Sequence, residues 1–372
     1  MHVLVAPDKF AGTLTAGEAA RAIRTGWLRH RPHDTVTTAP ISDGGPGFVD
    51  ALHAALGGDL HALTVTGPLG QPTPATLLLV GVTAYVESAQ ACGLALLPSD
   101  ATGRRPEPDI AARASTVGVG ELVAAAVDAG AETVVVGLGG SGTNDGGAGM
   151  LAALGAIAEP PDALTAGAAG LSDLTRVDLD PARARLAGRR LVAASDVTNP
   201  LLGLRGATNI YGPQKGLSSE RLFVVDGALS AFAHLVDRTT ADTPGAGAAG
   251  GLGYALALLG ATRRAGLDVV AEASGLVVEL TLADLVLTGE GALDPQTFTG
   301  KVVHGLAARC AEHGVPCVAL AGRVEVGSRE LRAAGIDGAY SMVEVVGADA
   351  SFERPAAALE SLAERVARTW GR

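Results

Sequence analysis

Five loops of this chain share a composition of Gly, Asp, Ser, Thr, Asn and Lys, and each follows a predicted strand. They span residues 8–13, 42–47, 137–149, 195–200 and 289–301. Glycine lets backbone N–H groups approach an anion, aspartate can bind Mg²⁺ or accept a proton, and lysine neutralises an anionic ligand. Phosphoryl transfer needs this combination, because positioning and electrostatic stabilisation supply most of its rate.

Four acidic residues in these loops are candidates for the chemistry. Asp43 can act as a general base or contact a substrate hydroxyl, and the alternative is a structural N-cap of the following helix. Asp196 ends an apolar run, where Mg²⁺ binding or catalysis is favoured over turn capping. Glu290 and Asp294 lie together in a glycine-flanked loop, and two carboxylates there suit a metal–nucleotide site.

Lysines in the same loops can supply the positive charge. Lys9 and Lys215 are candidates for pairing with a substrate carboxylate. Lys301 opens a predicted helix, where the helix dipole disfavours a cation, so a phosphate contact explains this residue better.

Residues 137–142 formally match the GxGxxG pattern of dinucleotide-binding proteins. Thr143, Asn144 and Asp145 prolong the loop where a dinucleotide-binding helix would begin, which argues against a nicotinamide-dependent dehydrogenase. The chain has no Walker A sequence, so a kinase with these loops would not be a P-loop enzyme.

The elements that position these loops begin with a β–α–β–α rhythm. An apolar run at 3–6 predicts a strand, and residues 35–40 read as a second one. The spacing at 15–30 and 48–56 predicts helices. Thr15 and Glu18 form a capping-box pattern at the start of the first helix. This alternation indicates a parallel sheet.

The rhythm changes between residues 61 and 88, where three strand-like runs without helices predict an antiparallel meander and a different domain. The α/β alternation resumes at residue 115. Residues 158–190 read as irregular, and a further strand is expected at 284–288. We therefore predict a discontinuous α/β domain of residues 1–60, 110–160 and 260–372, and an inserted mixed α/β domain of residues 61–109 and 161–259.

Composition narrows the function classes. The formal net charge of −11 disfavours nucleic acid and anionic membranes as partners, because both require a basic surface. Three cysteines without a CxxC pattern favour a reducing cytoplasm over a disulfide framework or a zinc site. No signal peptide or membrane span is indicated. We expect a cytoplasmic protein.

The loops belong to longer motifs with a fixed order along the chain. These are APDKFAGTLTA (6–16), ISDGGPGFVDAL (41–52), ESAQACGLALL (87–97), STVGVGEL (115–122), GLGGSGTNDGGAGM (137–150), SDVTNPLLG (195–203), GPQKG (212–216), PGAGAAGGLG (244–253) and DLVLTGEGALDPQTFTGK (284–301). Over nearly the whole chain they resemble the bacterial glycerate kinase family (glycerate 2-kinases).

The resemblance implies ATP-dependent phosphorylation of D-glycerate, with 2-phosphoglycerate favoured over 3-phosphoglycerate and with release of ADP. It also implies a flavodoxin-like, Rossmann-like parallel-sheet domain that carries an inserted mixed α/β domain, with the active site in the cleft between them. The implied partners are glycerate, ATP and Mg²⁺, with no nucleic acid and no membrane, and a homodimer is left open.

Resemblance and loop composition together assign roles. The catalytic set is Lys9, Asp43, Asp196 and Lys215, and the Mg²⁺ ligands are Asp196, Glu290 and Asp294. The substrate set is Lys9, Asp43, Gly44, Gln90, Ser141, Thr143, Asn144, Asn199, Gln214 and Lys215. The ATP set is Gly139, Gly140, Ser141, Asp145, Gly146, Gly147, Glu290, Asp294, Gln296, Thr297 and Lys301.

The chain departs from the family pattern at three positions. Ala11 stands where the family usually has Lys, Pro46 where it usually has Glu, and Ala292 where it usually has a basic residue. The first two changes could together remove an ion pair, or Lys9 could reach the position vacated at Ala11. They motivate two alternatives: a kinase for another small hydroxy acid, and a homologue that binds glycerate without turnover.

Overall fold

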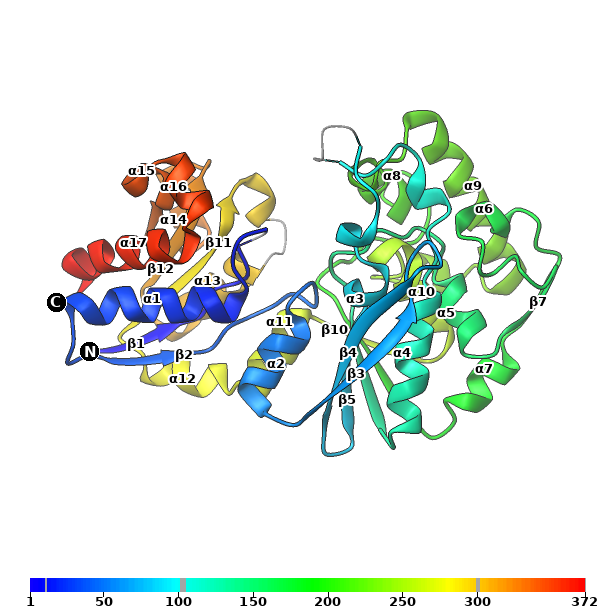
Figure 1. Cartoon of the computed structure of the whole chain (residues 1–372), viewed down its shortest axis with the longest axis horizontal. Coiled ribbons are helices and arrows are strands. Elements are labelled where there is room, and N and C mark those ends of the chain that lie inside the picture. The colour runs from blue at the N-terminus through cyan, green and yellow to red at the C-terminus, as the bar shows by residue number, and fades with distance from the viewer. Residues whose placement is uncertain (11, 101–104, 299–301, 372) are drawn as a thin grey trace. The chain divides into compact units, whose positions relative to one another are not determined.

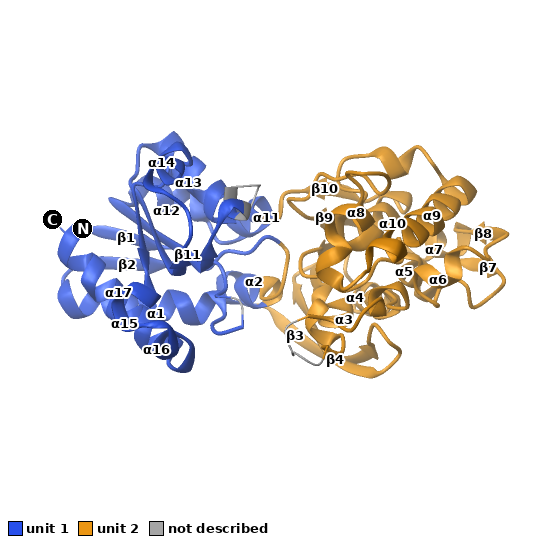
Figure 2. Ribbon diagram, turned by 90° about the horizontal axis from the view of Figure 1, so that it is seen from above, with its two compact units in different colours: residues 1–43, 50–57, 267–372 blue, residues 44–49, 58–266 orange. Residues whose placement is uncertain are grey.

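The computed structural model describes residues 1–10, 12–100, 105–298 and 302–371, and it divides into two compact units (Figures 1 and 2). Unit 1 contains residues 1–43, 50–57 and 267–372, and unit 2 contains residues 44–49 and 58–266. The predicted division placed residues 110–160 with the two ends of the chain. The structure assigns them to unit 2 instead, because β6 (Thr133–Gly137) pairs with two strands of that unit.

Unit 1 is built on a parallel sheet. Its strands are β1 (His2–Val5), β2 (Thr35–Thr38), β11 (Leu285–Leu293), β12 (Cys317–Val324) and β13 (Gly338–Ser341). Their order is β13-β12-β11-β1-β2, and every neighbouring pair is parallel. Counted along the unit, this is the 2-1-3-4-5 order of flavodoxin-like folds, so the expected fold class is confirmed.

Helices cover this sheet. They are α1 (Ala16–His30), α2 (Phe48–Leu56), α11 (Gly266–Ala273), α12 (Leu276–Leu282), α13 (Val302–His313), α14 (Ser328–Ala333), α15 (Met342–Val346), α16 (Ala348–Glu353) and α17 (Pro355–Trp370).

The first helix illustrates how sequence becomes packing. The predicted capping box is present: Thr15 Oγ1 accepts from Glu18 N at 3.2 Å, and Glu18 Oε2 accepts from Thr15 N at 2.9 Å. The helix buries Trp27 completely and packs against α17. Gly26 permits this close approach, because a Cβ there would lie 2.1 Å from a backbone oxygen of α17.

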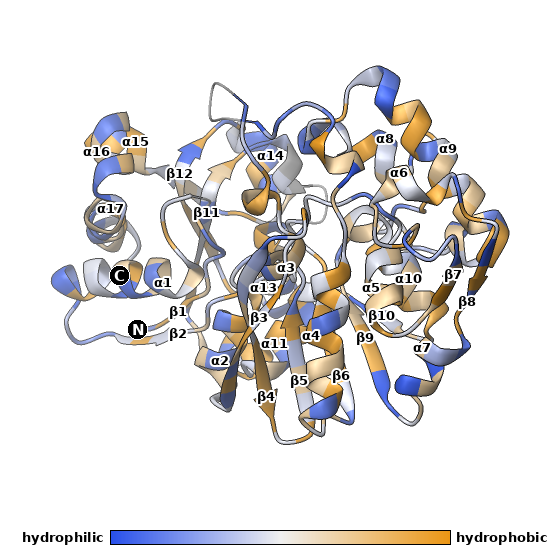
Figure 3. Cartoon of the chain, turned by 45° about the vertical axis from the view of Figure 1, so that its right-hand side comes forward, coloured by the Kyte–Doolittle hydropathy of each residue, from blue (hydrophilic) through white to orange (hydrophobic). Residues whose placement is uncertain are grey.

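Unit 2 has a mixed sheet of order β10-β9-β6-β5-β4-β3. The strands besides β6 are β3 (Asp59–Thr66), β4 (Pro72–Val80), β5 (Thr83–Glu87), β9 (Arg190–Ala194) and β10 (Thr262–Arg264). The β3–β4–β5 pairs are antiparallel, as predicted, and the other pairs are parallel. The apolar interior of the sheet is visible in Figure 3, where the body of β9 is coloured hydrophobic.

The helices of unit 2 are α3 (Ala89–Cys92), α4 (Val117–Asp128), α5 (Ala148–Ala153), α6 (Ala168–Leu171), α7 (Asp180–Arg185), α8 (Ala207–Tyr211), α9 (Ser219–Val236) and α10 (Leu252–Leu258). The segment expected to be irregular contains α6, α7 and an antiparallel pair, β7 (Ile157–Glu159) with β8 (Arg176–Asp178). These elements are three to six residues long, too short to produce a clear periodicity.

Strand β11 runs to Leu293, five residues beyond the predicted end, because its register with β12 continues to Val324. Glu290 therefore lies on a strand rather than in a loop.

Within the described residues, no helix has both the length and the apolar character of a transmembrane span.

Candidate active site

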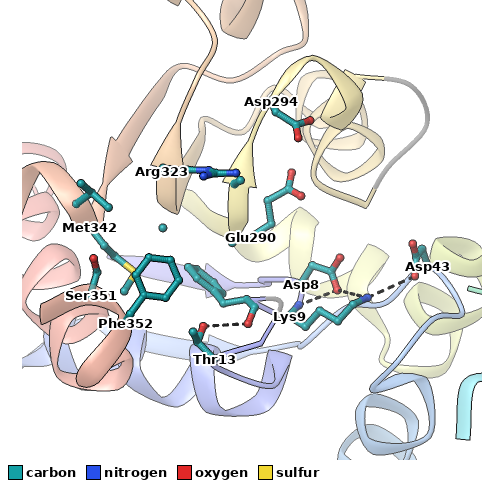
Figure 4. A pocket seen from close by; sticks show the side chains of 15 residues that line it. Asp8, Lys9, Thr13, Asp43, Glu290, Asp294, Arg323, Met342, Ser351 and Phe352 are labelled. Carbon is teal, nitrogen blue, oxygen red and sulfur yellow. Dashed lines mark hydrogen bonds and ion pairs between the residues drawn. The ribbon is translucent and has the colours of Figure 1, made fainter. Parts of the chain in front are cut away.

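A cavity of about 450 Å³ lies in unit 1 where the strand order reverses, next to β1 and β11 (Figure 4). In open α/β sheets, ligands bind beyond the carboxyl ends of the strands at this switch point. The lining residues are Asp8, Lys9, Phe10, Thr13, Asp43, Glu290, Gly291, Ala292, Asp294, Gly322, Arg323, Met342, Val343, Ser351 and Phe352. The cavity is therefore formed by the ends of β1, β11 and β12 together with α15 and α16.

A lysine lies between two carboxylates at one side of this cavity. Lys9 Nζ is 3.9 Å from Asp8 Oδ1 and 3.9 Å from Asp43 Oδ1, as Figure 4 shows. Asp43 precedes the first residue of α2 by five positions, so it is not the N-cap of that helix. The structure thus brings together two of the predicted catalytic residues, Lys9 and Asp43.

Asp8 is a carboxyl group of the cavity whose pKa is raised. Its side chain is 14% exposed, and Oδ1 accepts from Lys9 N at 2.7 Å. Burial raises the pKa of Asp8 to about 7, the positive charge of Lys9 opposes this, and the negative charges of Asp43 and Glu290 add to it. A carboxyl group that titrates near neutrality in a cavity is typical of functional sites.

Glu290 and Asp294 are held by one threonine. Thr297 Oγ1 donates to Glu290 Oε1 at 2.8 Å and accepts from Asp294 N at 3.2 Å, while Thr297 N donates to Asp294 Oδ1 at 3.2 Å. Thr297 is fully buried and Glu290 is 8% exposed. Thr297 therefore positions both acidic residues: its hydroxyl bonds the Glu290 carboxylate and the backbone N–H of Asp294, and its own N–H bonds the Asp294 carboxylate. Its predicted contact with ATP stays a prediction.

The predicted Mg²⁺ ligands do not all belong to this cavity. Glu290 and Asp294 line it, whereas Asp196 belongs to unit 2. Among the residues that the structure describes, no group of three or more His, Cys, Asp or Glu side chains is arranged to hold a metal ion.

In unit 2, Lys215 holds the loop of residues 137–149. Its Nζ donates to Thr143 O at 2.6 Å and to Ser141 Oγ at 2.9 Å, and only 2% of the residue is exposed. Burial lowers the pKa of Lys215 to about 8, and electrostatic interactions with Cys92 and Asp145 partly oppose this. In the structure, Lys215, Ser141 and Thr143 thus build the loop. Their predicted contact with substrate stays a prediction.

Asp145 organises the other end of the same loop. Its fully buried carboxylate accepts from Thr116 N (2.9 Å), Thr116 Oγ1 (2.8 Å), Gly147 N (3.0 Å) and Gly149 N (3.2 Å). Burial raises the pKa of Asp145, and these hydrogen bonds oppose the rise. The carboxylate therefore joins the starts of α4 and α5 and is not presented to a nucleotide.

The amides expected to bind phosphate are also used inside unit 2. Gly139 N donates to Gly44 O at 3.0 Å, and Gly146 N donates to Gly250 O at 3.0 Å. Gly147 N donates to Asp145, as described above. These N–H groups therefore have protein acceptors in the structure, and their predicted contact with phosphate stays a prediction.

Glycine is required where this loop meets residues 44–49. Gly140 has φ 75°, and a Cβ there would lie 2.6 Å from Pro46 Cδ. A Cβ on Gly44, whose φ is 92°, would lie 2.6 Å from Ala194 O. Glu87 completes the contact by accepting from Gly47 N at 3.0 Å. Pro46, one of the departures from the family pattern, therefore packs onto the glycine-rich loop.

The other predicted site residues of unit 2, Asp196 of the catalytic and metal sets among them, also have partners within the unit, apart from Gln214, which is exposed. The bonds run from Thr76 N to Gln90 Oε1 (2.7 Å), from Asn144 Nδ2 to Thr208 Oγ1 (2.8 Å), from Asn199 Nδ2 to Arg205 O (2.8 Å) and from Gly266 N to Asp196 Oδ1 (3.1 Å). Ala11, Lys301 and the side chain of Gln296 lie outside the described residues.

Sequence reasoning missed Asp8, Arg323 and Phe352. Asp8 was recognisable, because it lies in one of the five loops and directly precedes Lys9. Arg323 and Phe352 had no such signal: the first is the penultimate residue of β12 and lies in none of the five loops, and the second is one apolar residue on a short helix.

Fold and cavity define an α/β protein with a cavity lined by charged side chains at the switch point of a flavodoxin-like sheet. The chain belongs to the glycerate kinase family, whose model matches residues 3–371. This confirms the resemblance seen in the motifs.

Individual relatives agree with this assignment. The chain is 40% identical over 377 residues to the glycerate kinase of Bacillus subtilis, covering 99% of this chain and 97% of the relative. It is 37% identical over 356 residues to the glycerate 2-kinase of Escherichia coli, covering 93% and 92%. The crystal structure of a putative glycerate kinase 2 from Salmonella typhimurium LT2 matches with a TM-score of 0.80 and 37% identity, covering 100% of this chain and 98% of that chain.

Proposed function

We propose that this protein phosphorylates D-glycerate with ATP, giving 2-phosphoglycerate rather than 3-phosphoglycerate, and ADP. Membership of the glycerate kinase family supports the reaction class. The observation that carries the proposal is the unit 1 cavity, where Lys9 lies between Asp8 and Asp43 and a second acidic pair, Glu290 and Asp294, lines the same space.

The Lys9 cluster combines the two functions that a kinase needs at its acceptor. The ammonium of Lys9 attracts the negative charge of a carboxylate or a phosphate. One of the flanking carboxylates accepts the proton of the attacking hydroxyl, and we assign this role to Asp8 or Asp43. A general base is most effective when its pKa is near the working pH, which favours Asp8 over the Asp43 expected from sequence.

The acidic pair fits Mg²⁺. This ion prefers oxygen ligands and is usually bound by one or two carboxylates together with substrate phosphates, rather than by a complete protein cage. Glu290 and Asp294 provide two such carboxylates, already oriented by Thr297. When bound, the ion would neutralise charge on the phosphates. Asp196 remains a proposed ligand only from the sequence.

An activity panel tests the proposal. ADP release is measured with D-glycerate and with other small 2- and 3-hydroxy acids, at fixed ATP and Mg²⁺. We expect turnover with D-glycerate, and NMR of the product should show phosphorus coupled to the proton on C2. Turnover of a different acid without glycerate would reassign the substrate, as the Pro46 and Ala11 departures allow. Glycerate binding by calorimetry without ADP release would indicate a non-catalytic homologue.

A variant tests the metal assignment. Asp294→Asn keeps the shape of the side chain but removes its charge, so we expect the Mg²⁺ concentration for half-maximal rate to rise at least about tenfold. Asp268→Asn, on α11 and outside the cavity lining, is the matched control and should leave this concentration unchanged. An unchanged Mg²⁺ dependence in Asp294→Asn contradicts the assignment.

We also propose a cytoplasmic location, which agrees with three buried cysteines that form no disulfide.

A further inference from the structure

The unit 1 cavity has two chemically different sides. Figure 4 shows Met342, Ser351 and Phe352 grouped together, while Asp43 lies at the opposite side with Lys9 next to it. The cavity therefore runs from an apolar wall to a strongly charged end.

A short helical turn forms the apolar wall. Helix α15 ends at Val346, Gly347 reverses the chain with φ 85°, and α16 then presents Phe352. Met342 is 2% exposed and forms part of the core, whereas Phe352 is 69% exposed although it is a large apolar residue. A contact with a ligand would remove this aromatic surface from water.

Glycerate does not account for the apolar wall. Each of its three carbons carries oxygen, so it has almost no apolar surface to bury. A cavity of about 450 Å³ is also in the size range of sites for much larger ligands, about 300–1,000 Å³. The polar side chain in this wall, Ser351, already donates its hydroxyl to the backbone oxygens of Gly347 and Ala348. The wall thus offers flat apolar contact.

We propose that this wall, formed by Phe352, Met342 and Val343, is the binding subsite for the base of the nucleotide, with the phosphates directed toward Lys9 and Glu290. The inference rests on the proposed use of ATP. Stacking on an aromatic ring suits a planar base, and a methionine adds polarisable contact. The subsite makes α15 and α16 part of nucleotide recognition.

Calorimetric titration with two ligands tests the subsite. ADP contains the base, whereas inorganic pyrophosphate contains only the charged part. In Phe352→Ala we expect the Kd of ADP to rise about 5- to 100-fold, in keeping with the loss of one stacking contact, and the Kd of pyrophosphate to stay within about twofold. Phe223→Ala on α9 is the matched control, because Phe223 is 84% exposed and does not line the cavity. It should change neither Kd.

Three results would overturn the subsite: an unchanged ADP affinity in Phe352→Ala, an equal loss of ADP and pyrophosphate affinity, or no ADP binding by the wild type. The titration requires no turnover, so its outcome is separate from that of the proposed reaction. Phe352-dependent ADP binding without glycerate phosphorylation would keep the subsite and reject the reaction. If the protein phosphorylates glycerate but Phe352→Ala leaves the ADP affinity unchanged, the proposed reaction is kept and the proposed subsite is rejected.

Discussion

Lys215 provides a sharp test of how the 137–149 loop is held. Lys215→Met keeps an unbranched side chain of similar length in the same buried position but removes the ammonium that donates to Thr143 O and Ser141 Oγ. At pH 7.5 we expect the variant to be less stable by about 1–3 kcal/mol, because a charged hydrogen bond is lost and a buried carbonyl loses its donor.

The pH dependence of this difference follows from the lowered pKa. The folded pKa is about 8 and the ordinary value is 10.5, so between these values the unfolded chain holds a proton that the folded protein has released. Stability of the wild type therefore rises with pH through this window, and methionine contributes no such effect. The difference between the folded and the ordinary pKa changes the free energy of unfolding by about 3 kcal/mol over the whole titration. About 2 kcal/mol of this change falls between pH 7.5 and 10.

Urea denaturation of both proteins at pH 7.5, 9 and 10 measures the effect. The stability advantage of the wild type should widen by about 2 kcal/mol across this range. The chain has only three lysines, so ¹³C-labelled lysine can report the titration of Lys215 directly. A stability difference that is constant with pH, together with a lysine that titrates near 10.5, would refute the reasoning.

Three other predictions concern single sites. Ala249 has left-handed backbone angles (φ 51°, ψ 41°), so Ala249→Gly should raise the free energy of unfolding by about 0.5–1 kcal/mol and Ala249→Val should lower it; equal effects in denaturation experiments would contradict this. Gly140→Ala should destabilise the protein by about 1–3 kcal/mol because the new Cβ meets Pro46, and Pro46→Ala should recover part of the loss in a double-mutant cycle; purely additive effects would exclude the clash. Asp8 is protonated below its pKa of about 7, so kcat/KM should fall about tenfold per pH unit below pH 7; Asp8→Asn should lower the rate and remove this limb, and a variant that keeps it would exclude Asp8 as the base.

Much of the fold was predictable from local pattern. Strands β1 and β6 are short, mostly apolar runs, and α1 begins with the capping box that Thr15 and Glu18 predict. The antiparallel meander was recognisable because its strands follow one another without helices. The assignment of residues 110–160 was wrong because a parallel strand looks the same in either sheet. Only long-range pairing decides that β6 lies between β5 and β9.

The sequence predicted several of the residues that line the candidate site better than it predicted what each residue does. Lys9, Asp43, Glu290 and Asp294 do line one cavity. Residue type could not reveal, however, that Lys215 is buried and satisfied by protein oxygens. A buried polar group that holds a loop and a polar group that binds a ligand look alike in a sequence, because both lie in loops rich in glycine.

The path of the chain through the two units has a consequence for synthesis on the ribosome. β1 and β2 are made first, yet Val3 of β1 pairs with Leu285 of β11, which is made only after the whole of unit 2. Unit 2, by contrast, is almost continuous in the chain and can fold as soon as residue 266 has emerged. Its early folding would bring residues 58 and 266 into one compact body and so shorten the loop that unit 1 must close. Until β11 is made, β1 can pair only with β2, and its other edge lacks a partner strand.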